Sequence, residues 1–308
     1  METAIAVRDL RKSFKGHLSI GRHPVLRGVD LTVPPGVIYG FLGPNGAGKT
    51  TTLKILTGLL FPDGGTVSLL GRPLGDPQVR ARLGFLPEAP YFYDYLTGQE
   101  LLSFLGRLFG LERRALEERS RTLLSLVGLE GKGGLQLRKY SKGMLQRIGL
   151  AQALLNDPDL VILDEPVSGL DPVGRREIRD LILDLKAQGK TVFFSSHILA
   201  DAEAICDAVA ILMAGRVVRE GPLDALLGSE VRFWDVTLKA PEEFCPPAEA
   251  ALLARQGSQV LLRVEREEAL QSLLDGARAQ GARIRAVAPQ KFSLEDLFLA
   301  ELPKEEAP

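Results

Sequence analysis

The sequence predicts an α/β fold that contains an inserted helical segment and is followed by a smaller α+β appendage. Short apolar runs alternate with helical patterns up to about residue 89 and again from residue 160, as in a sheet covered by helices. Between about residues 89 and 155 the pattern is almost entirely helical. The composition changes near residue 228, and the 308 residues are enough for two domains. We therefore expect a first domain over residues 1–228, an accessory domain over 229–302 and a frayed tail over 303–308.

The first α/β stretch is expected to begin with strands. Strand patterns cover residues 4–7, 25–33, 37–42 and 66–70. Turn residues separate them, with Pro34-Pro35-Gly36 before the third run and Asp63-Gly64-Gly65 before the fourth. A helix is expected to open at residue 51, directly after a glycine-rich segment.

Helices and strands are also expected in the inserted segment and in the residues after it. Thr97 and Glu100 have the spacing of a capping box, which predicts a helix N-terminus. Further helices are expected over residues 111–127, 142–155 and 175–188, with strands at 160–163 and 191–195. In the C-terminal part, strands are expected at 231–238, 259–264 and 282–287, and helices at 265–280 and 293–299.

The glycine-rich segment is Gly43-Pro44-Asn45-Gly46-Ala47-Gly48-Lys49-Thr50, which fits the pattern G-x-x-x-x-G-K-[ST] at every fixed position. It lies between a buried strand and a helix that opens with Thr51, where successive backbone N–H groups and the helix dipole can face one anion. Lys49 can reach the β- and γ-phosphates, and Thr50 offers a hydroxyl to Mg²⁺. The sequence therefore predicts a nucleoside triphosphate site.

The composition limits the expected partners and the expected location of the protein. The net charge of −1 provides no bulk attraction to nucleic acid or anionic lipid, so no nucleic-acid partner is expected. Cys206 and Cys245 lack ligand spacing and are interpreted as buried small hydrophobes. No apolar stretch approaches the roughly 20 residues of a membrane span, which predicts a cytoplasmic protein that is soluble by itself.

Further motifs follow in a fixed order. Tyr140-Ser141-Lys142-Gly143-Met144 ends the inserted segment, Asp164-Glu165 ends the apolar strand at 160–164, and Ser168-Gly169-Leu170-Asp171 comes next. With His197 after the last strand, this order resembles the ABC ATPase family over about residues 4–221. Phe85-Leu86-Pro87-Glu88, the Y-S-K-G-M signature and the tail S-L-E-D-L-F-L resemble the branch that powers ABC exporters and drug-resistance pumps. The resemblance implies a nucleotide-binding core, an antiparallel β subdomain and the inserted helical subdomain.

Each of these residues has an expected task. At the end of its strand, Asp164 is placed to hold Mg²⁺, and Glu165 is placed to polarise the attacking water. By resemblance, His197 contacts the γ-phosphate and Phe14 stacks on adenine, although Phe14 is equally compatible with a core phenylalanine.

The signature predicts a partner. Ser141 is placed as the N-cap of a helix, where its hydroxyl and the helix dipole can face an anion. The resemblance implies that Ser141 and Gly143 contact ATP held by a second copy of the chain, so that two ATP molecules join a homodimer. A simple capping role for Ser141 remains the alternative.

The chain departs from the family in two places. Lys142 stands where the signature usually has glycine, and Glu88 stands where the family has glutamine. The Glu88 carboxylate offers oxygen to Mg²⁺, but its charge repels the γ-phosphate unless the metal lies between them. A solvated surface glutamate is the alternative interpretation.

We therefore expect the ATP-hydrolysing subunit of an ABC exporter, with ATP and Mg²⁺ as cofactors. The resemblance implies a separate transmembrane permease as partner, docked near Glu88 and Thr97, and a position at the inner face of the cell membrane. Two alternatives are a soluble ABC ATPase acting on ribosomes or DNA, and a nucleotide-sensing regulator. The chain lacks the second cassette or long coiled coil of the first class, and the intact Glu165 and His197 argue against the second.

Overall fold

The computed structural model describes residues 3–15, 21–228 and 231–301. The chain divides into two compact units, Met1–Leu223 and Asp224–Pro308, which are described separately. The predicted tail 303–308 lies outside the described residues, as do residues 1–2, 16–20, 229–230 and 302. Within the described ranges, no helix has both the length and the apolar character needed to cross a bilayer.

The centre of the first unit is a six-stranded sheet in the order β10-β9-β3-β8-β7-β6. Its strands are β3 (Ile38–Leu42), β6 (Leu83–Leu86), β7 (Leu160–Asp164), β8 (Thr191–Ser196), β9 (Ala208–Met213) and β10 (Arg216–Pro222). Neighbouring strands are parallel except for β10, which runs antiparallel to β9. Every residue of β3, β7 and β8 is buried, which explains why these strands are continuous apolar runs. In register, Leu42 pairs with Ser196 and Asp164 with Ser195, so the carboxyl ends of these three strands meet at one edge.

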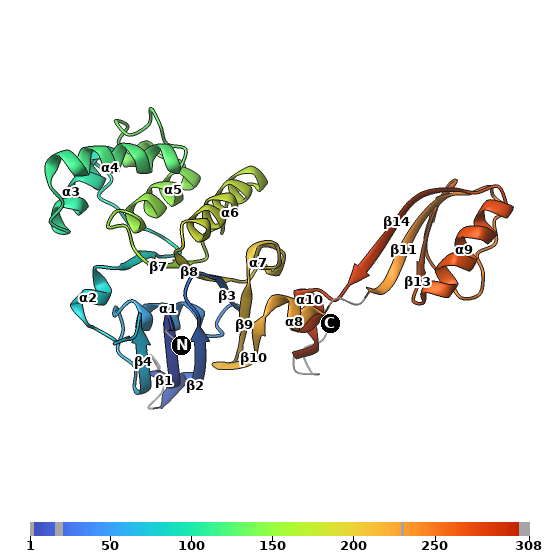
Figure 1. Cartoon of the computed structure of the whole chain (residues 1–308), viewed down its shortest axis with the longest axis horizontal. Helices are drawn as coiled ribbons and strands as arrows, with labels where there is room; N and C mark the ends of the chain where they lie inside the picture. The colour runs from blue at the N-terminus through green and yellow to red at the C-terminus, as the bar shows by residue number, and fades with distance from the viewer. Residues whose placement is uncertain (1–2, 16–20, 229–230, 302–308) are drawn as a thin grey trace. The chain divides into compact units, whose positions relative to one another are not determined.

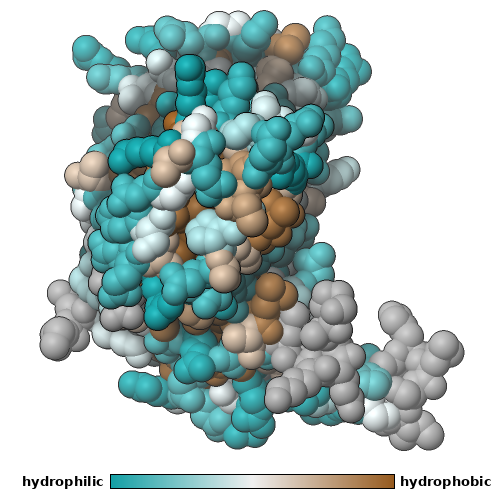
Figure 2. All heavy atoms as spheres, turned by 90° about the vertical axis from the view of Figure 1, so that its right-hand side faces the viewer, coloured by the Kyte–Doolittle hydropathy of each residue, from teal (hydrophilic) through white to brown (hydrophobic). Residues whose placement is uncertain are grey.

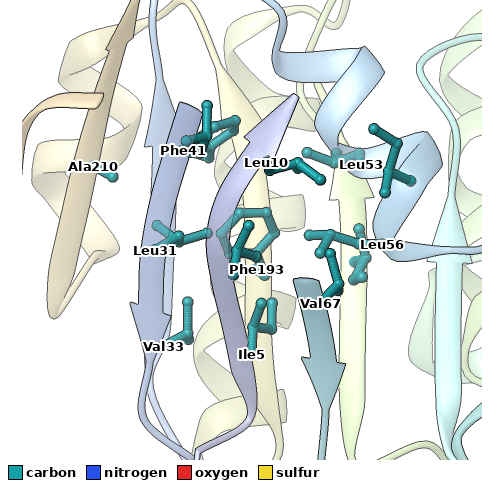
Figure 3. Packing of buried hydrophobic residues seen from close by; sticks show 14 of the residues in the cluster. Ile5, Leu10, Leu31, Val33, Phe41, Leu53, Leu56, Val67, Phe193 and Ala210 are labelled. Carbon is teal, nitrogen blue, oxygen red and sulfur yellow. The ribbon is translucent and has the colours of Figure 1, made fainter. Parts of the chain in front are cut away.

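A second sheet in this unit is antiparallel, in the order β2-β1-β4-β5. It contains β1 (Ile5–Lys15), β2 (Arg22–Val33), β4 (Gly64–Leu69) and β5 (Arg72–Pro73). Its apolar face shares one core with the central sheet, as Figure 3 shows for Ile5, Leu31 and Val67 beside Phe193. Leu53 and Leu56, from α1 (Lys49–Leu56), close the same core. This core fixes the start of α1, and with it the glycine-rich loop, against the sheet.

The helices of the first unit fall into two groups. Around the sheets lie α1, α2 (Pro77–Arg80), α6 (Pro172–Ala187) and α7 (Leu199–Ile205), whereas the inserted segment forms α3 (Gly98–Leu108), α4 (Arg113–Leu126), the 3₁₀ turn η1 (Leu137–Lys139) and α5 (Lys142–Ala153). Figure 1 shows α3, α4 and α5 grouped together, apart from the strands. The capping box at Thr97 is confirmed, because Thr97 and Glu100 each accept a bond from the other's backbone N–H. Helix α6 begins earlier than predicted because Asp171 caps it and Pro172 suits its first turn.

The second unit is a small α+β structure. Its sheet, in the order β12-β13-β11-β14, is antiparallel throughout and contains β11 (Val231–Lys239), β12 (Ala251–Gln256), β13 (Gln259–Val264) and β14 (Arg283–Lys291). Helix α9 (Glu267–Ala279) packs on one face and forms the core with β11 and β13. The short helices α8 (Leu223–Leu227) and α10 (Leu294–Glu301) flank the sheet in the sequence. Figure 2 shows a largely hydrophilic surface with hydrophobic residues in small groups.

The α/β fold predicted from the sequence is confirmed, including the antiparallel sheet and the helical insertion. Strands β5, β6, β9, β10 and β12 have no counterpart in the prediction. All six residues of β12 are exposed and give no alternating pattern. The interpretation of both cysteines as buried is correct for Cys206 and wrong for Cys245, which is exposed in the segment between β11 and β12.

Candidate functional site

The phosphate loop connects the end of β3 to the start of α1, and glycine is required at two of its positions. A Cβ on Gly43 would lie 2.3 Å from the carbonyl oxygen of Leu212. Gly48 has φ +112, and a Cβ there would lie 2.7 Å from Leu26 Cδ2. The loop therefore follows the edge of the sheet closely, which leaves its backbone N–H groups and the first turn of α1 available to an anion.

Lys49 lies beneath this loop with its side chain 6% exposed. Its ammonium donates to the carbonyl oxygens of Gly43 at 2.7 Å and Pro44 at 3.3 Å. It also forms an ion pair with Glu165 Oε1 at 3.3 Å. Lys49 thus joins the loop to the end of β7, and places a positive charge in the loop's concavity.

Asp164 is held by two hydroxyl groups. Ser195 Oγ donates to Asp164 Oδ1 at 2.6 Å, and Thr50 Oγ1 donates to the same oxygen at 3.3 Å. Burial raises the pKa of Asp164 above its ordinary value, and the bonds from Ser195 and Thr50 offset part of that effect. The carboxylate is therefore poorly solvated, which favours a cation beside it.

Glu165 and His197 form a dyad at the ends of β7 and β8. His197 Nδ1 lies 2.8 Å from Glu165 Oε2, and the backbone N–H of His197 donates to the same oxygen at 3.4 Å. Glu165 has φ +49, a conformation that non-glycine residues adopt rarely and that concentrates at functional sites. Its backbone N–H donates to Ser195 Oγ at 2.9 Å, which fixes this turn. Lys49 and His197 thus hold the Glu165 carboxylate, and the bond from its backbone N–H to Ser195 holds the main chain.

Lys49, Thr50 and Glu165 line a cavity of about 460 Å³, whereas Asp164, Ser195 and His197 are not among its lining residues. Its lining contains most of the residues predicted for the phosphate site, and Val25, which was not predicted. The lining residues are Val25, Pro44, Asn45, Gly46, Gly48, Lys49, Thr50, Thr51, Glu88 and Glu165. Phe14 is not part of the lining; it lies on β1, 41% exposed, with the Lys12 ammonium 5.7 Å from its ring centre.

The signature residues lie at a different cavity. Ser141 caps α5 by accepting the Met144 N–H at 3.3 Å, as predicted from its position. Ser141 and Gly143 line a cavity of about 430 Å³, which shares no lining residue with the phosphate cavity. Within one chain, the structure therefore does not bring Ser141 and Gly143 to the phosphate loop.

The donor set suits a hard cation bound beside phosphates. Thr50 and Asp164 present oxygen only and are hydrogen-bonded to each other, and the Glu88 carboxylate lines the same cavity. Among the described residues, no group of three or more His, Cys, Asp or Glu side chains could hold a metal by itself. The hydroxyl of Thr50 and the carboxylate of Asp164 are oxygen donors that suit Mg²⁺, which takes few protein ligands and completes its shell with water and substrate oxygens.

Ser195 is the main functional residue that sequence reasoning missed. Its hydroxyl is completely buried and connects Asp164 to the backbone of Glu165. A polar residue at the end of an otherwise apolar strand was the available signal, but the contact depends on the register between β7 and β8.

A phosphate loop on a parallel sheet, with carboxylates at the neighbouring strand ends, places the first unit among the P-loop nucleotide-binding proteins. The family model described as ABC transporter matches residues 26–168. An uncharacterized ABC transporter ATP-binding protein of Nostoc sp. is 43% identical over 315 residues, covering 99% of this chain and 91% of the relative. The chain therefore belongs to the ABC transporter ATP-binding proteins.

Other relatives and solved structures agree. The Nod factor export ATP-binding protein I of Burkholderia lata is 36% identical over 301 residues, covering 96% of this chain and 95% of that protein. A solved ATP-binding subunit of an ABC transporter is 36% identical, with a TM-score of 0.64 over 73% of this chain and 92% of that chain. A dimeric ATP-binding cassette in a post-hydrolysis state, bound to ADP and Pi, is 25% identical, with a TM-score of 0.66 over 71% of this chain and 98% of that chain. The prediction of an ATP-binding subunit of an ABC transporter is confirmed.

Proposed function

We propose that this chain is a Mg²⁺-dependent ATPase whose ATP-driven dimerisation powers export through a separate membrane permease. The observation that carries the proposal is the position of Glu165, whose carboxylate contacts Lys49 and His197 beside the phosphate loop. A carboxylate held in this way can accept a proton from a water molecule that attacks the terminal phosphate.

The remaining residues have supporting roles. The loop from Gly43 to Thr50 binds the phosphates, and Lys49 neutralises charge on the β- and γ-phosphates. Thr50, Asp164 and Glu88 would hold Mg²⁺, which when bound neutralises charge on the phosphate oxygens. His197 orients Glu165, and we infer that it contacts the γ-phosphate when ATP is bound.

A second copy completes the site. Ser141 and Gly143 line a cavity separate from the phosphate cavity, so their role toward ATP requires another chain. The likeness to a cassette solved as a dimer with ADP and Pi supports this arrangement. We infer that ATP joins two copies and that hydrolysis separates them.

The permease is expected to contact an exposed aromatic patch, formed by Tyr91, Tyr93, Tyr95 and Phe104. Tyr93 lies beside Tyr95 with ring centres 5.9 Å apart and meets the edge of Phe104 at 6.2 Å. Tyr91 is 96% exposed, and contiguous exposed apolar groups mark interaction sites. The patch follows Glu88 and flanks Thr97, the region expected to dock the permease, which would hold the chain at the inner face of the membrane.

Two further assignments stay proposals. Phe14 would stack on adenine from β1, with Val25 closing the cavity on the phosphate side. Residues 229–302 would form an accessory domain, because the phosphate cavity and the signature cavity are both lined by residues of the first unit.

Steady-state ATP hydrolysis by the purified chain tests the proposal. We expect phosphate release that requires Mg²⁺, stops in EDTA and is lost in Lys49→Ala, because that variant lacks the charge on the β- and γ-phosphates. Equal turnover in the wild type and in a folded Lys49→Ala variant would contradict the assignment.

A further inference from the structure

The two departures from the family pattern, Glu88 and Lys142, line one cavity. Its volume is about 230 Å³, and it lies between the loop after β6, the first turn of α5 and the segment after β7. Glu88 also lines the phosphate cavity, so the two cavities adjoin at this residue. An acidic and a basic residue that are 54 positions apart in the sequence thus line the same cavity.

The direction of the Lys142 side chain is set by Gly169. A Cβ built on Gly169 would lie 2.1 Å from Lys142 Nζ and 2.8 Å from its Cε, so the lysine extends over the place where a side chain would be. Gly169 has φ +69, which also favours glycine. The ammonium is therefore directed along the Ser168-Gly169 segment, and Ser168 lines the same cavity as Glu88.

Both charges are available for this interaction. Among the ion pairs of the described residues, none involves the Glu88 carboxylate or the Lys142 ammonium, and the two groups do not pair directly with each other. Both residues are exposed, so their attraction acts through partly solvated space. Glu88 therefore lies where the phosphate cavity adjoins the cavity that Lys142 also lines.

We propose that Lys142 is a positioning residue that attracts the Glu88 carboxylate away from the bound phosphates and offsets its negative charge. The lysine in the signature and the glutamate after β6 then act as a matched pair within one subunit. The proposal rests on the phosphate site proposed above, and it gives Lys142 a role toward ATP held by its own chain. A direct contact of Lys142 with ATP in a second copy is the competing explanation.

Equilibrium titration with ATP in EDTA, at protein concentrations where the chain is monomeric, separates the two explanations. Without metal, the repulsion between Glu88 and the phosphates is not screened by a cation. We expect Lys142→Gln to weaken ATP binding about fivefold, a factor within the range of coupling between neighbouring charges. Lys142→Arg, which keeps the charge, should bind ATP as the wild type does.

The double variant decides the question. In a Glu88→Gln background, Lys142→Gln should no longer change ATP affinity, because the repelling carboxylate is absent. The coupling should also decrease at high salt, which a purely structural effect would not. The exposed Lys139, in η1, provides a control, since Lys139→Gln should have the same effect in the wild type and in the Glu88→Gln background.

Two results would overturn the inference: unchanged affinity in Lys142→Gln, or an equal loss in both backgrounds. Absence of ATP binding by the wild type would instead contradict the proposed site itself. The assay does not depend on hydrolysis, so these failures are distinguishable.

Discussion

Replacement of Ser195 by alanine is the sharpest test of how the carboxylates are held. The hydroxyl of Ser195 is fully buried, donates to Asp164 at 2.6 Å and accepts the Glu165 backbone N–H at 2.9 Å. Alanine removes both contacts without adding volume. The Glu165 turn, which has φ +49, then loses the bond that fixes it.

The size of the effect follows from the bonds that are lost. A hydrogen bond to a charged group contributes about 1.5–3 kcal/mol, and a buried N–H left without a partner costs about 1–3 kcal/mol. We therefore expect the free energy of unfolding to fall by about 3 kcal/mol. If roughly half of this loss is added to the activation free energy of ATP hydrolysis, kcat decreases about tenfold.

Ser196→Ala is the matched control. Ser196 is equally buried, but among the described residues its hydroxyl bonds only to the backbone of Ile198: it accepts the N–H at 2.9 Å and donates to the carbonyl oxygen at 3.3 Å. Both variants should lose thermal stability, whereas only Ser195→Ala should lose kcat. The acid limb of its pH profile should also move to higher pH, because the Ser195 bond lowers the pKa of Asp164. Equal kcat values in the two variants would refute the reasoning.

Two other predictions concern Asp164 and the aromatic patch. Burial raises the folded-state pKa of Asp164, so its ionisation opposes folding at pH values above that pKa. Asp164→Asn should therefore have a higher Tm than the wild type at about pH 8. The difference in Tm should shrink as the pH falls toward the pKa of Asp164, where the carboxylate becomes protonated. A lower Tm for the variant at about pH 8 would contradict this. The Tyr91→Asp variant should be lost from the membrane fraction of the cells that produce it. The control Leu59→Asp, at an exposed residue outside the aromatic patch, should be retained there. Equal retention of the two variants would contradict the proposed docking face.

Local patterns predicted much of the fold and site. The phosphate loop has a fixed spacing because Gly43 and Gly48 meet backbone or side-chain atoms that leave no room for a Cβ. The capping box at Thr97 and the N-cap at Ser141 were predictable because each hydrogen bond joins residues only three positions apart in the sequence. Buried parallel strands were recognisable as apolar runs.

Contacts between distant segments were not predictable in this way. The bridge from Ser195 to Asp164 depends on the register of two parallel strands. The dyad of Glu165 and His197 joins residues that the sequence placed near the same phosphate but not in contact. The cavity shared by Glu88 and Lys142 depends on how the inserted helices fold back onto the sheet.

We propose that ATP joins two copies of this chain and that hydrolysis assisted by Glu165 separates them. In Glu165→Gln, the amide cannot take the proton from water, so hydrolysis should slow by about 10²–10⁴-fold while ATP still binds. On size exclusion this variant should elute as a dimer with ATP and Mg²⁺ and as a monomer with ADP. Adding Ser141→Arg should abolish the dimer, because the bulk of arginine would occupy the cavity that we propose to face the second copy. An oligomeric state that is independent of ATP in both variants would contradict the account.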